Sequence, residues 1–281
     1  MEVITAPEAV QRRCLALRAA KRRIGLVPTM GFLHEGHLAL IRAARAAADA
    51  TVVSLFVNPT QFGPGEDFEC YPRDPDRDLA LCREAGVDVV FQPRAGDLYA
   101  PDHSVYVEET RLSRGLCGAS RPGHFRGVLT IVTKLFHLTV PDVAVFGRKD
   151  AQQARLVRQL VRDLDMPVRI LVAPIVREPD GLALSSRNRY LSRTERAWAP
   201  SICRALREAQ SRWAAGVRDA EELRAGVTAA LSGGPGADIE YVAIVDEETF
   251  EPVARIARPA MLAVAVKLPS ARLIDNVTLG G

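Results

Sequence analysis

The sequence predicts an α/β protein, in which a parallel sheet carries helices on both faces and is followed by a smaller α+β domain. Short apolar runs alternate with helical patterns through about the first 175 residues. These runs are apolar at consecutive positions, as in strands that are buried on both faces. After residue 175 the pattern changes to two helical segments, a Gly/Pro break and three β-like runs.

The first domain, residues 1–175, is predicted to be Rossmann-like and to carry nucleotide binding and catalysis. A basic amphipathic helix, expected within residues 1–23, precedes strands expected at 24–28, 51–57, 87–93, 142–147 and 167–174. Helical patterns lie between the strands, at 36–49, 75–86, 127–139 and 150–164. A strand–helix–strand repeat of this kind favours a parallel sheet covered on both sides.

The second domain, residues 176–281, is predicted to be smaller and α+β. Two Ala/Arg/Glu-rich helices are expected at about 193–215 and 218–231, before the break "SGGPGAD". Three antiparallel strands are expected beyond it, at 239–246, 260–268 and 271–279.

The composition excludes several classes of protein. The 281 residues are 48% hydrophobic and have a formal net charge of +3, an excess too small to indicate nucleic acid as a partner. Five scattered cysteines without a C-x-x-C pair predict neither a disulfide framework nor a thiolate zinc site. No apolar run reaches the roughly 18–20 residues of a membrane span. We therefore expect a cytoplasmic protein that does not bind membranes.

Four loops follow expected strands and carry residues that can do chemistry. They are "PTMGFLHEGH", "NPTQFG", "GRKDAQQ" and "REPDGLALSSRNRYL". Ligands of open α/β sheets bind where loops leave the carboxyl ends of the strands. These four loops are therefore the candidate site.

The opening loop places His34 and His37 three residues apart, where a glycine-bearing turn enters a helix. A zincin motif needs H-E-x-x-H, and here the second histidine comes one residue too early. Phosphate binding fits better, because free N–H groups at a helix start attract anions and imidazoles can donate to phosphate oxygens. Two histidines that only cap a turn are the simpler alternative.

The other loops are individually ambiguous. Lys149 suits a phosphate but could be a solvated surface residue, and Asp150 could be only a helix cap. Asn58 and Gln61 offer amides to a substrate hydroxyl or carboxylate, although Asn58 could instead form an Asx turn before Pro59. The Ser-Ser-Arg-Asn loop is donor-rich and basic, as in a phosphate clamp, but also reads as plain loop.

Taken in this order, the loops resemble the pantothenate synthetase (pantoate–β-alanine ligase) family. The resemblance covers nearly the whole chain and includes "SLFVNPTQFGPGEDFECYPRD", "RPGHFRGVLTIVTKLF" and "VREPDGLALSSRNRYLS". The H-x-G-H portion alone indicates only the wider superfamily of nucleotidyltransferases and class I aminoacyl-tRNA synthetases. "NPTQFG" and "SSRNRYLS" at these separations are more specific.

The resemblance implies an ATP-dependent ligase of coenzyme A biosynthesis that condenses pantoate and β-alanine to pantothenate. Pantoate would be activated as pantoyl adenylate with release of pyrophosphate, and β-alanine would then displace AMP. It also implies Mg²⁺, chiefly held by the phosphates of ATP, and a homodimer. No protein ligand for the magnesium is implied.

The resemblance assigns roles to individual residues of this chain. The catalytic group would comprise His37, which acts at the α-phosphate, together with His34 and Lys149 at the phosphates. Gln61 would bind both pantoate and β-alanine, with Asn58 nearby. Gln153 would bind pantoate. ATP would be bound by Met30, Gly31, Phe32, Leu33, His34, Glu35, Gly36, His37, Gly147, Arg148, Lys149, Asp150, Val176 (at the adenosine), Leu184, Ser185, Ser186 and Arg187.

Three positions depart from the family pattern. Arg148 stands where a glutamate is usual, Ala151 where the residue is usually aromatic, and Leu184 where methionine is usual. The Arg148 exchange reverses a charge beside Lys149. It leaves open a binding protein that has lost turnover, and a nucleotidyltransferase for another acid or nucleotide is the other alternative.

Overall fold

The computed structural model describes residues 1–280 and divides them into two compact units. The first unit comprises residues 1–113, 121–148 and 152–174, and the second comprises 114–120, 149–151 and 175 onward. Two short segments that precede residue 175, 114–120 and 149–151, therefore belong to the second unit. The chain pattern did not indicate these two excursions, and we keep the division into domains 1–175 and 176–281 as a prediction.

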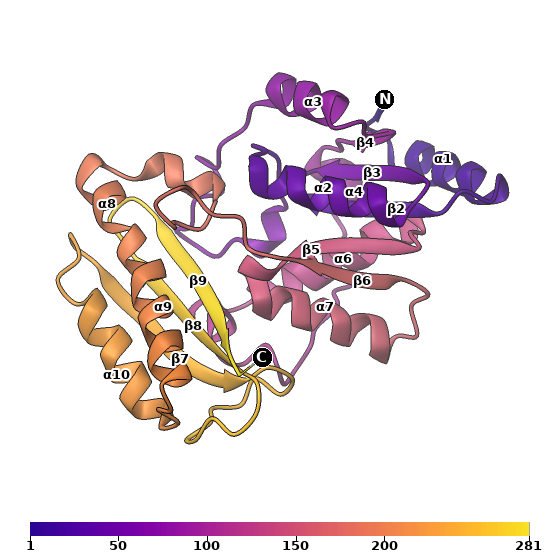
Figure 1. Ribbon diagram of the computed structural model, residues 1–281. Helices are drawn as coiled ribbons and strands as arrows, with labels where there is room; N and C mark the ends of the chain where they lie inside the picture. Colours follow the sequence, from indigo (N-terminus) through magenta and orange to yellow (C-terminus); the bar gives the residue numbers. More distant parts are fainter. Residues whose placement is uncertain (281) are drawn as a thin grey trace. The chain divides into compact units, whose positions relative to one another are not determined.

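The first unit is built on six parallel strands in the order β1-β4-β3-β2-β5-β6 (Figure 1). The strands are β1 (Glu2–Ile4), β2 (Ile24–Thr29), β3 (Ala50–Leu55), β4 (Val89–Phe91), β5 (Val143–Gly147) and β6 (Arg169–Ala173). Its helices are α1 (Pro7–Ala19), α2 (Glu35–Ala47), α3 (Pro75–Glu84), α4 (Ala95–Leu98), α6 (His124–Thr139) and, from its second residue, α7 (Ala151–Asp163). It also holds the 3-10 turn η1 (Pro59–Gln61), whereas the turn η2 (Arg148–Asp150) has one residue in this unit and two in the second. The strand order reverses between β2 and β5, which is where sheets of this type bind ligands.

Both faces of this sheet are buried, as the consecutive apolar residues predict. Val27, Val53 and Val90 lie in register on one face and pack with Ile41 of α2 and Cys82 of α3. Residues one position away point to the opposite face and are also fully buried, for example Leu26 and Val52. Helices α1 and α6 contact each other and β2. The predicted parallel sheet with helices on both faces is confirmed.

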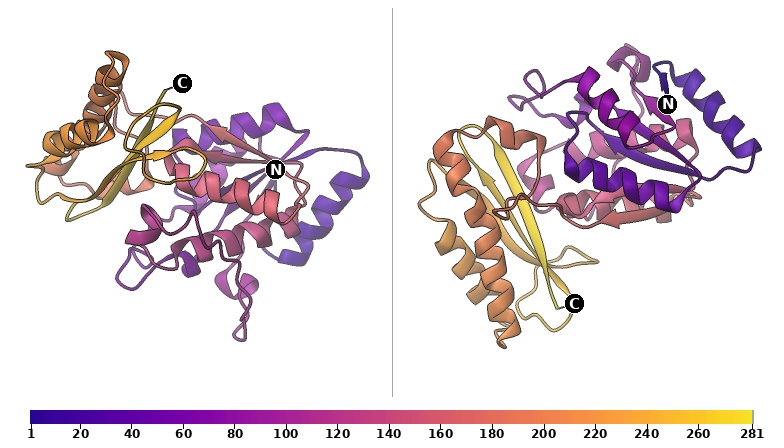
Figure 2. Two further views of the ribbon diagram at one scale, coloured as in Figure 1. Left: turned by 90° about the horizontal axis from the view of Figure 1, so that it is seen from below. Right: turned by 45° about the horizontal axis from the view of Figure 1, so that its top comes forward.

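The second unit packs two long helices on a three-stranded antiparallel sheet. Strands β7 (Asp238–Asp246), β8 (Ala260–Lys267) and β9 (Arg272–Leu279) pair in sequence order. Helix α9 (Pro200–Ala214) contacts β9, and α10 (Ala220–Leu231) contacts α9 and β7, so the two helices lie side by side on the sheet (Figure 2). The unit also holds α5 (Cys117–Ser120), α8 (Arg193–Trp198) and the 3-10 turn η3 (Ser186–Tyr190). The predicted α+β architecture is confirmed.

Two element predictions were wrong in detail, and one short strand was missed. The helix expected at about 193–215 is two helices, because Pro200 lacks an N–H and starts a new helix at its first position. The strand expected at 51–57 ends at Leu55, before the turn at Asn58. Strand β1 was missed, since its three residues are too few to show a periodic pattern.

Candidate functional site

The opening loop leaves β2 and turns sharply before α2. Gly31 and Phe32 both have positive φ, of 81° and 49°, a conformation that glycine adopts freely and phenylalanine does not. The loop is held from outside by Asp78 of α3, whose carboxylate accepts the N–H groups of Phe32 and Leu33, each at 2.7 Å. The side chain of Thr29 accepts the N–H of Gly31 at 3.2 Å.

These contacts correct the physical argument that free amides would bind phosphate here. The N–H groups of Gly31, Phe32 and Leu33 are already bonded within the protein. At the start of α2, the N–H groups of His34 and Gly36 are also occupied, by imidazole nitrogens. These five N–H groups therefore stabilise the conformation of the loop itself.

The two histidines form a reciprocal cap at the start of α2. His34 Nδ1 accepts the N–H of Gly36 at 3.1 Å, and His37 Nδ1 accepts the N–H of His34 at 3.3 Å. The two rings lie 4.1 Å apart between centroids. An imidazole nitrogen that accepts an N–H carries no proton, so both histidines hold their proton on Nε2. The two histidines therefore do cap the helix, as the simpler alternative predicted. The cap also holds their two imidazole N–H donors in fixed orientation.

Glu35 points its carboxylate at Arg42, with which it forms an exposed ion pair. Within residues 1–280, no three His, Cys, Asp or Glu side chains are grouped so as to hold a metal ion.

The amide of Gln61 is buried, with 9% of its surface exposed, beside the end of β2. Its Oε1 accepts from Asn58 Nδ2 at 3.1 Å, and its Nε2 donates to the sulfur of Met30 at 3.1 Å. A thioether is a weak acceptor, so this N–H group would gain from a ligand carboxylate or hydroxyl instead. Gln61 is therefore equipped to bind a polar substrate.

Asn58 is only 1% exposed and is saturated by protein partners. Its Oδ1 accepts the hydroxyls of Tyr99 at 2.8 Å and Thr60 at 2.9 Å, and its Nδ2 also donates to the carbonyl of Gly127. The Asx turn is present as well, with the N–H of Thr60 at 3.4 Å. These contacts fix the Asn58 amide beside Gln61.

A cavity of about 370 Å³ adjoins the opening loop within the first unit. Three of the predicted ATP-binding residues line it, together with apolar side chains from the carboxyl ends of β3 and β4 and polar residues of the loop before α3. The lining comprises Met30, Gly31, Phe32, Leu55, Phe56, Val57, Phe68, Arg73, Asp74, Pro75, Asp78, Gln92, Pro93, Arg94 and Ala95.

The segment 147–153 divides between the two units. Gly147, Arg148 and Gln153 lie in the first unit, whereas Lys149 and Asp150 lie in the second. The carbonyl of Lys149 accepts from Asn276 Nδ2 at 3.1 Å, and Ala151 is packed in a cluster with Val245, Met261 and Ala263. Arg148 is half-buried on the turn η2.

The Ser-Ser-Arg-Asn segment is anchored rather than loose. Val176 accepts the N–H of Leu184 at 3.0 Å, and Arg177 forms two bonds to Asp275 of β9, at 2.6 and 2.9 Å. Ser185 caps the turn η3 by accepting the N–H of Arg187 at 3.3 Å.

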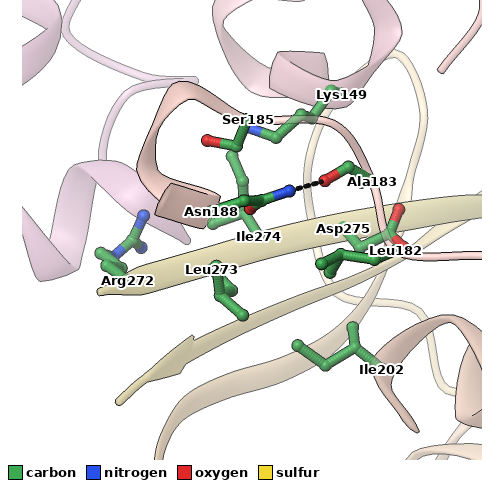
Figure 3. A pocket seen from close by; sticks show the side chains of 10 residues that line it. All are labelled: Lys149, Leu182, Ala183, Ser185, Asn188, Ile202, Arg272, Leu273, Ile274 and Asp275. Carbon is green, nitrogen blue, oxygen red and sulfur yellow. Dashed lines mark hydrogen bonds between the residues drawn. The ribbon is translucent and has the colours of Figure 1, made fainter. Parts of the chain in front are cut away.

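Lys149 and Ser185 line a small cavity of about 10 Å³ in the second unit, about the size of one water molecule (Figure 3). Asn188 reaches the same cavity and donates to the carbonyl of Ala183 at 3.1 Å. Its buried Oδ1 has no hydrogen-bond partner among the described residues. Sequence reasoning gave Asn188 no role, since an asparagine in a polar loop carries no distinctive pattern.

The chain is similar to known proteins over nearly its whole length. The model of the pantoate-beta-alanine ligase family matches residues 2–278. A pantothenate synthetase from Thermotoga petrophila is 54% identical over 280 residues, covering all of both chains. A pantothenate synthetase from Nitratidesulfovibrio vulgaris is 50% identical over the full length of both.

Solved structures give the same result. The pantothenate synthetase of Thermus thermophilus has a TM-score of 0.94 and 44% identity, with both chains fully covered. A pantoate–β-alanine ligase from Francisella tularensis, complexed with beta-gamma ATP and β-alanine, has a TM-score of 0.81 and 34% identity over 99% of this chain and 97% of that one. In residues 1–280 no helix has the length and hydropathy to cross a bilayer. The chain belongs to the pantoate–β-alanine ligase family and is a ligase.

Proposed function

We propose that this ligase condenses pantoate and β-alanine with ATP, through a pantoyl-adenylate intermediate. The observation that carries the proposal is the buried Asn58–Gln61 amide pair, which leaves the Gln61 N–H on a weak sulfur acceptor in a chain of this family. A substrate carboxylate or hydroxyl is a better acceptor for that N–H. The relative complexed with ATP and β-alanine supports these two as co-substrates.

In the first step a carboxylate oxygen of pantoate attacks the α-phosphorus of ATP, and the bond to the β-phosphate oxygen breaks. The products are pantoyl adenylate and pyrophosphate. Negative charge grows on the phosphate oxygens during this displacement, and donors held in fixed orientation stabilise it most. We assign this role to the Nε2–H groups of His37 and His34 and to the ammonium group of Lys149.

In the second step the amine of β-alanine attacks the acyl carbon. The bond from that carbon to the bridging oxygen breaks, AMP leaves, and the amine loses a proton as the amide forms. Adenylation is needed because a free carboxylate is a poor acyl donor. No covalent bond to the protein is required in either step.

The remaining assignments are proposals on the same basis. Pantoate is bound by Gln61 and Gln153, with Asn58 holding Gln61 in place. The residues assigned to ATP are Met30–His37, Gly147, Arg148, Lys149, Asp150, Val176 and Leu184–Arg187. Magnesium enters with ATP as the Mg–ATP substrate and is held chiefly by the phosphates, as is usual for this ion. We also propose a cytoplasmic homodimer.

The test is an assay for AMP and pyrophosphate with purified protein, Mg–ATP, D-pantoate and β-alanine. Both products should form only when pantoate is present, and amide should form only when β-alanine is added. A panel of other short hydroxy acids is the control for substrate identity. ATP consumption that does not depend on pantoate would contradict the proposal, and turnover of another acid instead would favour a different adenylating ligase.

A further inference from the structure

The main-chain carbonyl of Gln61 is held by two side chains that the sequence left without a role. His124 Nδ1 lies 2.8 Å from this oxygen, and Arg121 Nη2 donates to it at 3.3 Å. Both residues come from the segment that enters α6. Gln61 is therefore positioned from its backbone as well as through the amide of Asn58.

The contacts define the protonation of His124. A carbonyl oxygen only accepts, so Nδ1 must carry the proton. Arg121 Nη1 lies 3.0 Å from Nε2 of the same ring, and a guanidinium only donates, so Nε2 must be unprotonated. His124 is thus a neutral imidazole with its proton on Nδ1, the opposite arrangement from that of His34 and His37.

Arg121 also forms an ion pair with Glu66, in the loop that follows Gln61. Its Nε and Nη2 donate to the two carboxylate oxygens of Glu66 at 2.7 and 2.6 Å, a two-pronged pair in which the side chains are only 15% and 25% exposed. Burial would raise the pKa of Glu66, but the bonds to Arg121 outweigh it and leave that pKa lowered. The carboxylate is therefore charged and paired at neutral pH.

The start of α6 lies directly against the turn that carries Gln61. A Cβ added at Gly127 would lie 2.2 Å from the carbonyl oxygen of Thr60 and 2.6 Å from the Gln61 nitrogen, both of them backbone atoms. Only glycine permits this approach, which also brings the Gly127 carbonyl within 3.1 Å of Asn58 Nδ2. The helix start and the turn are thus fixed to each other before any ligand binds.

We propose that Arg121 and His124 are positioning residues for Gln61, and that Glu66 fastens the adjoining loop to them, so that the amide that donates to pantoate is pre-oriented. The inference rests on the proposed function, because it takes Gln61 to bind pantoate. Arg121 links three acceptors on two segments: the Glu66 carboxylate, the Gln61 carbonyl and the His124 ring. A lysine, with a single ammonium nitrogen, does not reproduce this fork.

The kinetic test compares Arg121→Lys and Glu66→Gln with wild type. Each should raise the KM for pantoate about tenfold, the equivalent of one charge-assisted hydrogen bond, while kcat and the KM for ATP stay within about twofold. Such a split follows because positioning of Gln61 acts on the binding of one substrate. Glu69→Gln is the matched control, an exposed carboxylate in the same loop, and should leave all three constants unchanged. The proposal would be overturned if, in the Arg121 and Glu66 variants, kcat fell and the KM for ATP rose by the same factor as the KM for pantoate.

A spectroscopic test does not depend on activity. Long-range ¹H–¹⁵N correlation spectra of wild type should show the proton of His124 on Nδ1, and Arg121→Lys should shift the ring toward a mixture of tautomers. A proton on Nε2 in the wild type would overturn the inference even if the enzyme is active on pantoate. Conversely, a wild type without pantoate-dependent AMP release refutes the proposed function, while the spectrum still decides whether His124 and Arg121 brace Gln61.

Discussion

The two units hold their candidate site loops by different physical means. In the first unit, the loop after β2 is held through its main chain, because Asp78 accepts two amide N–H groups. In the second unit, residues 176–184 form a turn closed by the bond from the Leu184 N–H to the Val176 carbonyl. This turn is held through a side chain, by the ion pair of Arg177 with Asp275 on β9. The first arrangement fixes a local backbone shape, whereas the second fastens one element to another.

The difference extends to the carboxyl groups. Burial raises the pKa of Asp78, and its two amide donors only partly offset that effect. In the second unit, burial likewise works against ionisation of Glu195, but bonds from Ser192 and Ser270 prevail and lower its pKa to about 2. The pKa values of these two buried carboxyls are therefore shifted in opposite directions.

The largest expected effect comes from breaking the ion pair of the second unit. Asp275 is almost fully buried, so Asp275→Ala leaves the Arg177 guanidinium without its partner and should destabilise this unit by about 3–5 kcal/mol. Urea denaturation followed by tryptophan fluorescence measures it, since Trp198 and Trp213 both lie in this unit. Asp180→Ala removes the exposed pair with Arg196 and should cost about 0–1 kcal/mol. Equal costs would show that the buried pair is not the anchor.

The next largest effect concerns His37. With the loop amides committed to the protein, the imidazole N–H groups are the donors that we assign to the phosphates, so His37→Asn should lower the adenylation rate about 10²–10³-fold. Asparagine keeps an acceptor for the His34 N–H, and the melting temperature should change little. Single-turnover release of pyrophosphate measures the step, and His137→Asn, at an exposed site in the last turn of α6, is the control. Near-normal release in the His37 variant would remove this loop from catalysis.

A somewhat smaller effect is expected at the main-chain anchor. Asp78→Ala leaves the N–H groups of Phe32 and Leu33 without this acceptor and should destabilise the first unit by about 2–3 kcal/mol. Asp76→Ala, an exposed acid in the same first turn of α3, should cost about 0.5 kcal/mol through the helix dipole alone. Hydrogen exchange of the amides at residues 31–33 provides the direct measurement. Unchanged protection there would mean that the loop holds its shape without Asp78.

The smallest expected effects concern the pH dependence of stability, to which Glu195 and Asp78 contribute with opposite signs. The pKa of Glu195 is lowered on folding, so its stabilisation is complete above the unfolded value near 4.5 and is lost as pH falls toward about 2. The pKa of Asp78 is raised, so its contribution is most favourable below the unfolded value near 3.8 and decreases as pH rises through the folded value. Acid unfolding curves should flatten in Glu195→Gln and steepen in Asp78→Asn. Parallel curves for both variants would contradict this assignment.

The sequence was sufficient for the fold because the pattern of burial is local. The consecutive apolar residues Val52 and Val53 indicate a strand that is buried on both faces. The apolar run at 260–267 indicates a strand equally well. The site residues followed from motif spacing and family resemblance. The supporting contacts did not, because Asp78, Arg121 and Arg177 act across 45 to 98 residues of chain. A charged residue in a loop or helix shows no pattern that names its distant partner.

Two details show the limit most plainly. Free amides at the start of α2 were a sound expectation from chain geometry, yet Asp78 occupies two of the neighbouring loop amides. Asn58 was assigned beside the substrate, yet Tyr99 and Gly127 use its hydrogen-bonding groups. In both cases the hydrogen bonds come from a tertiary partner that the local sequence does not reveal.

In the proposed mechanism, pantoate is activated as an acyl adenylate. This step is tested most directly by incubating the enzyme with Mg–ATP, β-alanine and pantoate labelled with ¹⁸O in both carboxylate oxygens. Attack of the carboxylate on the α-phosphorus, followed by cleavage of the acyl carbon–oxygen bond, predicts one ¹⁸O atom in the phosphate of AMP and one in the pantothenate amide, by mass spectrometry. Unlabelled AMP, or label in inorganic phosphate alongside ADP, would contradict the account.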